Sequence, residues 1–316
     1  MSYLSERKIV LITKQTRADE LVKKYNNMAQ ASYYVQHMGG DIGEYVEEAK
    51  VYKTAVADSS NRLQNLARMQ QIDVEHVPNF IFGEDDIVIV LGQDGLVANT
   101  LKYLKGQPLI AVNPDPARYD GVLLPFRSSD LTGVVQDVLN NRRSTKEITM
   151  AAAELNDGQS LLAVNDFFIG RQTHVSARYT LKINGKEENQ SSSGIIVSTG
   201  LGSTGWLKSV LAGAREIAAT LAGAAAVSGQ EFLPGTSVLP WNSNYLYYSV
   251  REPFPSNTTG TTLVFGKIQD SPLSITSQMP ENGVIFSDGV EQDFLRFNAG
   301  IEARISVAAK KGSLVV

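Results

Sequence analysis

The chain has 316 residues, of which 43% are hydrophobic and 20% charged, with a formal net charge of −4. This composition supports one large or two ordinary cores, and the lack of a long basic run argues against nucleic acid or an anionic membrane as the main partner. The chain has no cysteine and three widely spaced histidines, so we expect neither disulfides nor a metal site built from protein ligands. No apolar run approaches the roughly 20 residues that span a bilayer, and no signal peptide is visible. We therefore expect a cytoplasmic protein without a membrane partner.

The first half alternates apolar strands with helical patterns, which is typical of a parallel, doubly wound α/β sheet. We expect strands at 9–12, 72–77, 87–91 and 108–112, and helices at 18–37, 41–69, 96–104 and 129–140. The helix expected at 41–69 carries more apolar residues than one small sheet needs to cover. We therefore predict a homo-oligomer, a dimer, with this helix at or near the interface; packing inside its own domain is the alternative.

The stretch after the strand at 87–91 is the first candidate for chemistry. The strand stops at Gly92-Gln93-Asp94-Gly95, and a helical pattern follows. A glycine-rich turn between a strand and a helix aims backbone N–H groups and a positive helix end at an anion such as phosphate. Asp94 cannot bind phosphate itself, so a functional role there would be that of a base or of a metal-linked carboxylate. The alternative is a simple turn in which Asp94 caps the helix.

From about residue 144 the pattern changes to short alternating segments separated by turn signals. Asn156-Asp157-Gly158, Asn184-Gly185, Asn282-Gly283 and Asp288-Gly289 predict hairpin turns of antiparallel sheets. One helical segment, about 206–221, is the exception. We expect an α/β domain at 1–143 and a β-rich, sandwich-like domain at 144–316, whose C-terminal tail is able to pack back on the first domain.

Two stretches of the second half carry further candidates. Asn165-Asp166 stands between apolar strand residues, where a polar pair is costly unless something hydrogen-bonds to it. Its amide and carboxylate suit ribose hydroxyls or an adenine amine, and a turn held by the pair's own side chains is the alternative. In the stretch 198–206, a strand runs into glycines and hydroxyl residues that open a helix. This composition allows a ligand close approach to backbone donors, or a helix cap at Ser203 or Thr204.

Taken in order, these stretches resemble the NAD kinase family. Gly92-Gln93-Asp94-Gly95-Leu96 is similar to its Gly-Gly-Asp-Gly-Thr motif, Asn165-Asp166 to its Asn-Glu motif, and 198–206 to its Gly/Thr-rich stretch ending in Gly-Ser-Thr-Ala-Tyr. The segments 113–121 and 248–253 are more similar to the mitochondrial-type branch. The resemblance runs from about residue 87 to the C-terminus and implies an α/β domain followed by a β-rich domain.

The resemblance also implies an activity and a set of roles. The protein would be a phosphotransferase that moves a phosphoryl group from ATP, bound with Mg²⁺, to the adenosine ribose 2′-hydroxyl of NAD. Asp94 would be the general base. The phosphate loop would contain Gly92, Gln93 and Gly95. The residues implied for NAD binding are Asn165, Asp166, Thr199, Ser203, Thr204 and Gly205.

Four departures from the family pattern leave other functions open. Gln93 and Leu96 stand where a glycine and a threonine are usual, Asp166 is one methylene shorter than glutamate, and Gly205-Trp206 replaces Ala-Tyr. A kinase for another hydroxyl acceptor, such as a sugar or a lipid, is one alternative. A nucleotide-binding regulator that has lost catalysis through Gln93 and Leu96 is the other.

Overall fold

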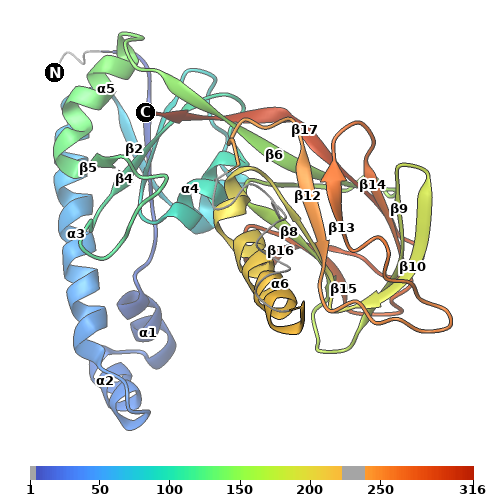
Figure 1. The fold of residues 1–316 in the computed structure, drawn as a ribbon. Helices are drawn as coiled ribbons and strands as arrows, with labels where there is room; N and C mark the ends of the chain where they lie inside the picture. Colours follow the sequence, from blue (N-terminus) through green and yellow to red (C-terminus); the bar gives the residue numbers. More distant parts are fainter. Residues whose placement is uncertain (1–4, 223–238) are drawn as a thin grey trace. The chain divides into compact units, whose positions relative to one another are not determined.

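The computed structural model describes residues 5–222 and 239–316. The chain divides into two compact units, residues 1–146 with 313–316, and residues 147–312 (Figure 1). Neither unit has, among its described residues, a helix that combines the length and the apolar character needed to cross a bilayer.

The first unit is built on a parallel sheet whose strands lie in the order β17–β4–β3–β1–β2, with β5 beside β4. The strands of this unit are β1 (Ile9–Thr13), β2 (Met69–Asp73), β3 (Ile87–Leu91), β4 (Pro108–Asn113), β5 (Phe126–Arg127) and the end of β17 (Glu302–Val315). Every residue of β1 and β3 is buried, so both faces of these strands are covered, as expected for central strands of a doubly wound sheet.

Helices lie between or after these strands along the chain. They are α1 (Arg17–Tyr25), α2 (Met28–His37), α3 (Ile42–Gln64), α4 (Asp94–Leu101) and α5 (Leu131–Leu139), with short 3₁₀ turns η1 (Val74–Asn79) and η2 (Ser128–Asp130). On one face, α3 and α5 pack Leu63 and Val135 into a common core with Leu11 and Ile89 of the strands.

The helix predicted at 18–37 is two helices. Asn26 adopts a left-handed φ of 67°, and the Asn27 side chain caps α2 by accepting from the Gln30 backbone N–H. Two adjacent asparagines therefore end one helix and start the next, because asparagine tolerates φ > 0 and is a strong cap. The helix predicted to reach residue 69 ends at Gln64. The strand predicted at 72–77 lies at 69–73 and is followed by the 3₁₀ turn η1, which Asp73 caps.

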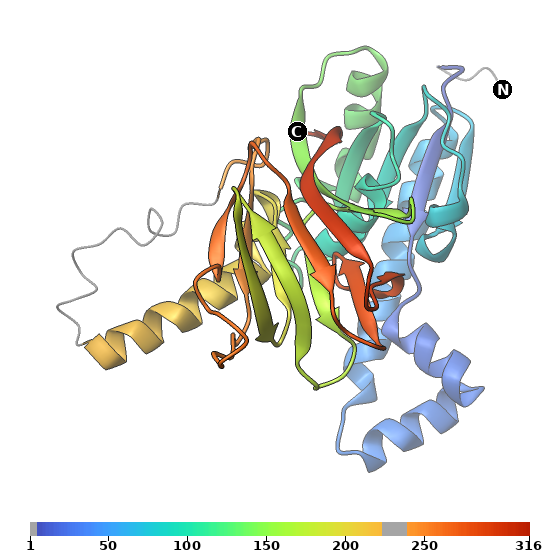
Figure 2. The same cartoon turned by 90° about the vertical axis from the view of Figure 1, so that its right-hand side faces the viewer.

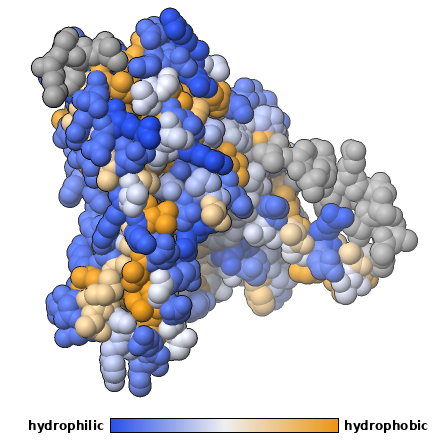
Figure 3. All heavy atoms as spheres, turned by 90° about the vertical axis from the view of Figure 1, so that its left-hand side faces the viewer, coloured by the Kyte–Doolittle hydropathy of each residue, from blue (hydrophilic) through white to orange (hydrophobic). Residues whose placement is uncertain are grey.

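The α1–α2 hairpin and the first turns of α3 carry apolar side chains on their surface (Figure 3). The large hydrophobic residues exposed there are Met28, Tyr33, Tyr34, Met38 and Val46. Large contiguous apolar patches are uncommon on monomeric proteins, so this group of side chains bears on the predicted oligomer.

The second unit is a sandwich of two mainly antiparallel sheets (Figure 2). One sheet has the order β10–β9–β14–β17, with β6 beside β17 and β7; the other has the order β13–β12–β11–β8–β15–β16. Its strands are β6 (Thr145–Leu155), β7 (Ser160–Ala163), β8 (Asp166–Arg171), β9 (Ala177–Ile183), β10 (Lys186–Ser192), β11 (Ile195–Ser198), β12 (Leu246–Val250), β13 (Phe265–Ile268), β14 (Leu273–Ser277), β15 (Gly283–Ser287) and β16 (Val290–Arg296). The predicted fold class, α/β followed by β-rich, is confirmed.

Three of the four predicted hairpin turns form. Asn184-Gly185 joins β9 to β10 and Asp288-Gly289 joins β15 to β16, both with positive φ at the two central residues, as a type I′ turn requires. Residues 156–159 join β6 to β7. Asn282-Gly283 is not a hairpin turn, because β14 and β15 belong to different sheets. Helix α6 (Trp206–Ala222) follows the 3₁₀ turn η3 (Leu201–Thr204) close to the predicted bounds.

Candidate functional site

The predicted site residues fall into two groups, one in each unit. The phosphate-loop candidates and Asp94 lie at the carboxyl end of β3 in the first unit, where ligands of open α/β sheets bind. The NAD-binding candidates lie in the second unit, at the start of β8 and after β11.

In the first unit, the Asp94 carboxylate holds a loop and does not cap the helix. Helix α4 begins at Asp94, and its N-cap is Gln93 without a side-chain hydrogen bond. The Asp94 oxygens instead accept from the backbone N–H groups of Val122, at 3.2 Å, and Leu123, at 2.9 Å. The capping alternative is therefore wrong. A carboxylate offers about four acceptor positions, so two remain for a ligand, a proton or a metal ion.

Gly92 and Gly95 differ in the space that surrounds them. A Cβ on Gly92 would lie 2.6 Å from Leu96 Cδ2, whereas a Cβ on Gly95 would meet nothing within 4 Å. Leu96, which stands where the family has threonine, is buried and fills the space over Gly92. The Gln93 side chain hydrogen-bonds to the Tyr119 hydroxyl. Gly95 thus keeps the outer part of the loop open.

Lys14 is a residue that the sequence reasoning missed. It follows β1 directly, and its backbone N–H donates to the Tyr52 hydroxyl at 2.9 Å, which in turn donates to the Leu91 carbonyl at 2.9 Å. Tyr52 therefore fixes Lys14 beside the residue that precedes Gly92. Burial lowers the pKa of Lys14, and the negative charge of Glu48 opposes part of that shift.

The neighbouring charges of the first unit are already paired. Buried Glu48 accepts from Arg17 Nε at 2.6 Å and from the Tyr119 hydroxyl at 2.8 Å, and Glu44 pairs with Arg17 and Arg118 at 3.3 and 3.0 Å. In contrast, no carboxylate of the described chain lies within ion-pair distance of the Lys14 ammonium. The sequence signal that could have identified Lys14 is its position directly after a buried strand, at the same sheet edge as the glycine-rich turn.

In the second unit, the Asn165-Asp166 bend is held from outside. The Asp288 carboxylate accepts backbone N–H groups of Val164 at 3.0 Å, Asn165 at 2.6 Å and Asp166 at 3.4 Å. Asp288 sits at φ 54° in the β15–β16 turn. The sequence identified Asp288 only as a turn residue. Asp288 lies more than a hundred residues from the bend in the sequence, so no local pattern could indicate this contact.

The polar side chains of the bend have no hydrogen-bond partner among the described residues. Asn165 is half-buried, and Asp166 is only 8% exposed. Burial and the negative charge of Asp288 raise the pKa of the Asp166 carboxyl from 3.8 to about 7. A turn stabilised by the pair's own side chains would show Asx hydrogen bonds, and the bend shows none. Two unpaired polar groups in this position are available to a ligand.

The glycine- and hydroxyl-rich loop is packed against this bend. The buried Thr199 hydroxyl donates to Val164 O at 2.6 Å and accepts from Gly202 N–H at 3.1 Å, and Thr199 N–H donates to Asn165 O at 2.9 Å. A Cβ on Gly202 would lie 2.1 Å from Asn165 O. Thr199 and Gly202 thus position the bend, and the Thr199 side chain itself is not exposed.

The outer residues of the loop are open. Ser203 and Thr204 hydroxyls donate to carbonyls of the preceding turn, those of Gly200 and Leu201, at 2.7 and 3.1 Å, which is not the geometry of a helix cap. Thr204 and Gly205 are exposed, and a Cβ on Gly205 would meet nothing closer than 3.5 Å. The structure therefore brings Asn165, Asp166 and this loop together within the second unit.

No family model matches the chain. The "Probable NADH kinase" of Oryza sativa subsp. japonica is 23% identical over 228 residues, which are 65% of this chain and 63% of that protein. The "NAD kinase" of Chlorobium phaeobacteroides (strain BS1) is 30% identical over 127 residues, 38% of this chain and 43% of that protein. The matches thus span less than two thirds of either relative.

Two solved structures share the architecture. Yeast NADH kinase complexed with NADH superposes with a TM-score of 0.60 at 15% identity, covering 99% of this chain and 84% of that one. An NAD kinase from Archaeoglobus fulgidus in complex with ATP gives a TM-score of 0.57 at 15% identity, covering 98% of this chain and 93% of that one. This chain has the NAD kinase fold. The resemblance to the NAD kinase family is confirmed, while the mitochondrial-type branch stays a prediction.

Within this NAD kinase fold, no group of three or more acidic or histidine side chains in residues 5–222 and 239–316 is arranged to hold a metal ion. Mg²⁺ usually keeps several waters and binds through one or two carboxylates plus the phosphates of its substrate. The Asp94 carboxylate, with two acceptor positions left, fits that mode of binding.

Proposed function

We propose that this chain is an NAD kinase, which transfers the γ-phosphoryl group of ATP to the adenosine ribose 2′-hydroxyl of NAD. The observation that carries the proposal is a set of polar side chains without a protein partner among the described residues. Asn165 and Asp166, at the start of β8, lie at predicted positions, and Lys14, beside the phosphate loop, was not predicted. Buried or half-buried polar groups without partners are costly, and their retention indicates a ligand.

In the first unit, the proposed roles are binding of the phosphate donor and removal of the proton from the acceptor hydroxyl. The Gly92 N–H donates to the Val112 carbonyl at 3.2 Å, so the N–H groups that follow it, at the start of α4, are the ones offered to anionic phosphate. Lys14 adds positive charge beside them. Mg²⁺ arrives with ATP and neutralises phosphate charge. Asp94 accepts the proton of the acceptor hydroxyl. Phosphoryl transfer depends mainly on positioning and charge neutralisation, which these groups supply.

In the second unit, the proposed role is recognition of the acceptor dinucleotide. The Asn165 amide offers both a donor and an acceptor, and Asp166, with a pKa of about 7, offers either a carboxylate or a carboxylic acid at neutral pH. Exposed Thr204 and Gly205 complete a polar surface for the nucleoside. Asp288, Thr199 and Ser203 support it by holding the bend and the loop.

The departures from the family motif are accommodated by the fold. The Gln93 side chain is bound to Tyr119, and Leu96 packs over Gly92, so neither change blocks the open backbone at Gly95. This favours an active kinase over a regulator without catalysis. Changing Gln93→Gly and Leu96→Thr together should leave the turnover equal or higher; activity gained only in this double variant would support the regulator.

Two further features are part of the proposal. The exposed apolar side chains on the α1–α2 hairpin and α3 support a homodimer that buries this surface, which light scattering at micromolar concentration tests directly. The absence of cysteine supports a reducing, cytoplasmic location.

The decisive experiment for the activity is a direct assay of product. Purified protein is incubated with Mg-ATP and either NAD or NADH, and the 2′-phosphorylated dinucleotide is separated by chromatography. Inorganic polyphosphate replaces ATP in a parallel reaction. Formation of NADP or NADPH supports the proposal. Nucleotide binding without transfer from either donor would refute it, and transfer to a sugar would favour the other kinase.

A further inference from the structure

The strand order of the parallel sheet in the first unit reverses between β1 and β3. The chain passes from β1 to β2 on one side of β1, and then places β3 and β4 on the other side. In open α/β sheets, ligands bind outside the carboxyl ends of the strands at such a switch point. Lys14 directly follows β1 and the phosphate loop directly follows β3, so both belong to this one position of the sheet.

The two strands part from each other at the switch point but not from their other neighbours. β1 stays paired with β2 as far as Thr13, and β3 stays paired with β4 as far as Leu91. The pairing of β1 with β3 ends one residue earlier, at Ile12 and Val90. The separation is therefore local, and the backbone groups that it leaves unpaired need other partners.

The hydroxyl of Tyr52, from α3, takes the place of the next ladder bond. The Ile87 N–H donates to the Lys8 carbonyl at 2.9 Å. Continued along the strands, this ladder would join the Lys14 N–H to the Leu91 carbonyl. The Lys14 N–H donates instead to the Tyr52 hydroxyl at 2.9 Å, and this hydroxyl donates to the Leu91 carbonyl at 2.9 Å. Because a hydroxyl both donates and accepts, neither backbone group is left unpaired.

The inserted hydroxyl sets the spacing of the two strand ends. A direct bond would hold the Lys14 nitrogen about 2.9 Å from the Leu91 oxygen. Two bonds that meet at the hydroxyl oxygen, at a roughly tetrahedral angle, hold the same two atoms roughly 5 Å apart. The Tyr52 ring belongs to the buried core of the unit, and burial raises the pKa of its hydroxyl. The spacer is therefore fixed in position and keeps its proton.

Resting on the proposed function, we propose that Tyr52 is a positioning residue of the phosphate-donor site. Its hydroxyl spreads the carboxyl ends of β1 and β3, and so holds Lys14 and the phosphate loop at the separation that a bound phosphate group requires. Lys14 is half-buried, and its side chain extends from the residue whose N–H Tyr52 holds. Without the hydroxyl, the strand ends either close or lose two hydrogen bonds, and in both cases the ammonium moves relative to the loop.

The experiment measures the Kd of Mg-ATP by calorimetry on the full chain, without dinucleotide. Tyr52→Phe keeps the buried ring and removes only the hydroxyl, and it should weaken binding about 3- to 10-fold. In a Lys14→Met background, the same change should alter the Kd by less than about twofold, because residues that act together are not additive. Tyr33→Phe removes a hydroxyl from a side chain of α2 that is 72% exposed, and it should change nothing.

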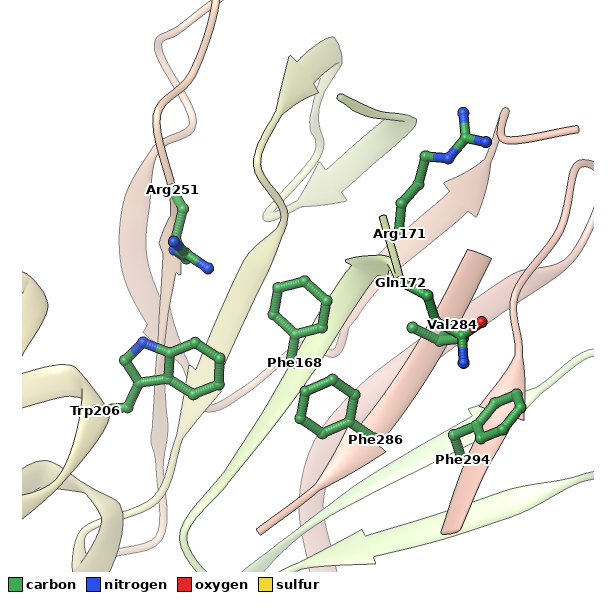
Figure 4. Close-up of a pocket in the computed structure, with 8 residues that line it drawn as sticks. All are labelled: Phe168, Arg171, Gln172, Trp206, Arg251, Val284, Phe286 and Phe294. Carbon is green, nitrogen blue, oxygen red and sulfur yellow. The ribbon is translucent and has the colours of Figure 1, made fainter. Parts of the chain in front are cut away.

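A second control measures the effect of a general loss of packing. Phe286 lines an aromatic pocket of the second unit together with Phe168 and Trp206 (Figure 4), and its ring stacks on that of Phe168 with centroids 5.0 Å apart. Phe286→Leu removes this contact and changes no residue of the first unit. It should leave the Kd of Mg-ATP unchanged, and a loss equal to that in Tyr52→Phe would overturn the inference.

The inference also fails if a folded Tyr52→Phe variant binds Mg-ATP as wild type does, or if its loss of affinity is the same with and without the Lys14 ammonium. Should Tyr52→Phe not fold, amide exchange in wild type decides: the Lys14 N–H should be protected, and rapid exchange would refute the inserted bond. These readings do not depend on catalysis. Coupled binding of Mg-ATP without phosphoryl transfer would refute the kinase and leave the positioning role standing, whereas transfer without coupling would refute the positioning role alone.

Discussion

Asp166 should lower the stability of the second unit as pH rises, and Asp166→Asn should remove this dependence. The carboxyl is 8% exposed and has no hydrogen-bond donor among the described residues, and the ionised Asp288 lies next to it. Its ionised form is therefore disfavoured in the folded state relative to the unfolded chain. Asparagine has nearly the same shape and stays neutral, so it mimics the protonated acid at every pH.

The magnitude follows from the pKa values of this carboxyl in the two states. The folded pKa of about 7 lies above the unfolded value of 3.8, so the favourable contribution of the protonated group is complete below pH 3.8. It is lost progressively as pH rises, until the folded group also ionises above about pH 7. A tenfold difference in acidity between the folded and unfolded states corresponds to about 1.4 kcal/mol, which limits the total loss to about 4 kcal/mol in the free energy of unfolding.

The assay is urea unfolding followed by tryptophan fluorescence. Both tryptophans, Trp206 and Trp241, belong to the second unit, so the signal reports on that unit. The free energy of unfolding of Asp166→Asn should exceed that of wild type by about 1 kcal/mol at pH 4.5 and by about 4 kcal/mol at pH 8. Asp270→Asn, an exposed change in the same unit, should follow wild type. An equal pH dependence in wild type and Asp166→Asn would refute the reasoning.

Three further changes test the separate parts of the site. Lys14→Met should raise the KM for ATP about 10- to 100-fold, because one desolvated positive charge beside the phosphates is lost, whereas Lys23→Met on exposed α1 should leave it unchanged in steady-state kinetics. Asn165→Ala should weaken dinucleotide binding by about 1–3 kcal/mol, and an unchanged Kd by calorimetry in a folded variant would remove this residue from the site. Gly202→Ala should destabilise the second unit by about 1–3 kcal/mol, because its Cβ would lie 2.1 Å from Asn165 O and the loop must shift; a wild-type urea midpoint would contradict that packing.

The sequence predicted the parts of the fold that local patterns control. The apolar run 87–91 and the alternation of strands with helices indicated a parallel sheet, and Asn184-Gly185 and Asp288-Gly289 indicated hairpins. The errors lie where one local signal competes with another. Asn26 and Asn27 interrupt a continuous apolar stripe, and Asn282-Gly283 has the composition of a hairpin turn but joins strands of different sheets.

The chemistry of the candidate site was only partly visible in the sequence. Short motifs located Asp94 and Asn165-Asp166, because glycines and isolated polar pairs stand out among apolar residues. The residues that hold them did not stand out. Asp288 contacts the bend across more than a hundred residues, and Tyr52 connects two strands from the middle of α3, so only the tertiary structure shows either contact.

The central claim, that Asp94 is the general base of an NAD kinase, is tested most directly by the single-turnover rate of Asp94→Asn. Asparagine keeps one acceptor for the Leu123 N–H but cannot take up a proton, so the rate of NADPH formation from NADH and saturating Mg-ATP should fall about 10²–10⁴-fold, with NADH binding unchanged.

The loop that Asp94 holds requires its own control. Gly121→Ala disturbs this loop without touching the carboxylate, because Gly121 has a φ of +62° and its Cβ would lie 2.7 Å from Asn113 Nδ2. If Asp94 acts only by holding the loop, both variants should slow the reaction equally. If Asp94 is the base, the loss should be much larger for Asp94→Asn than for Gly121→Ala. A folded Asp94→Asn variant that turns over at the wild-type rate would contradict this role.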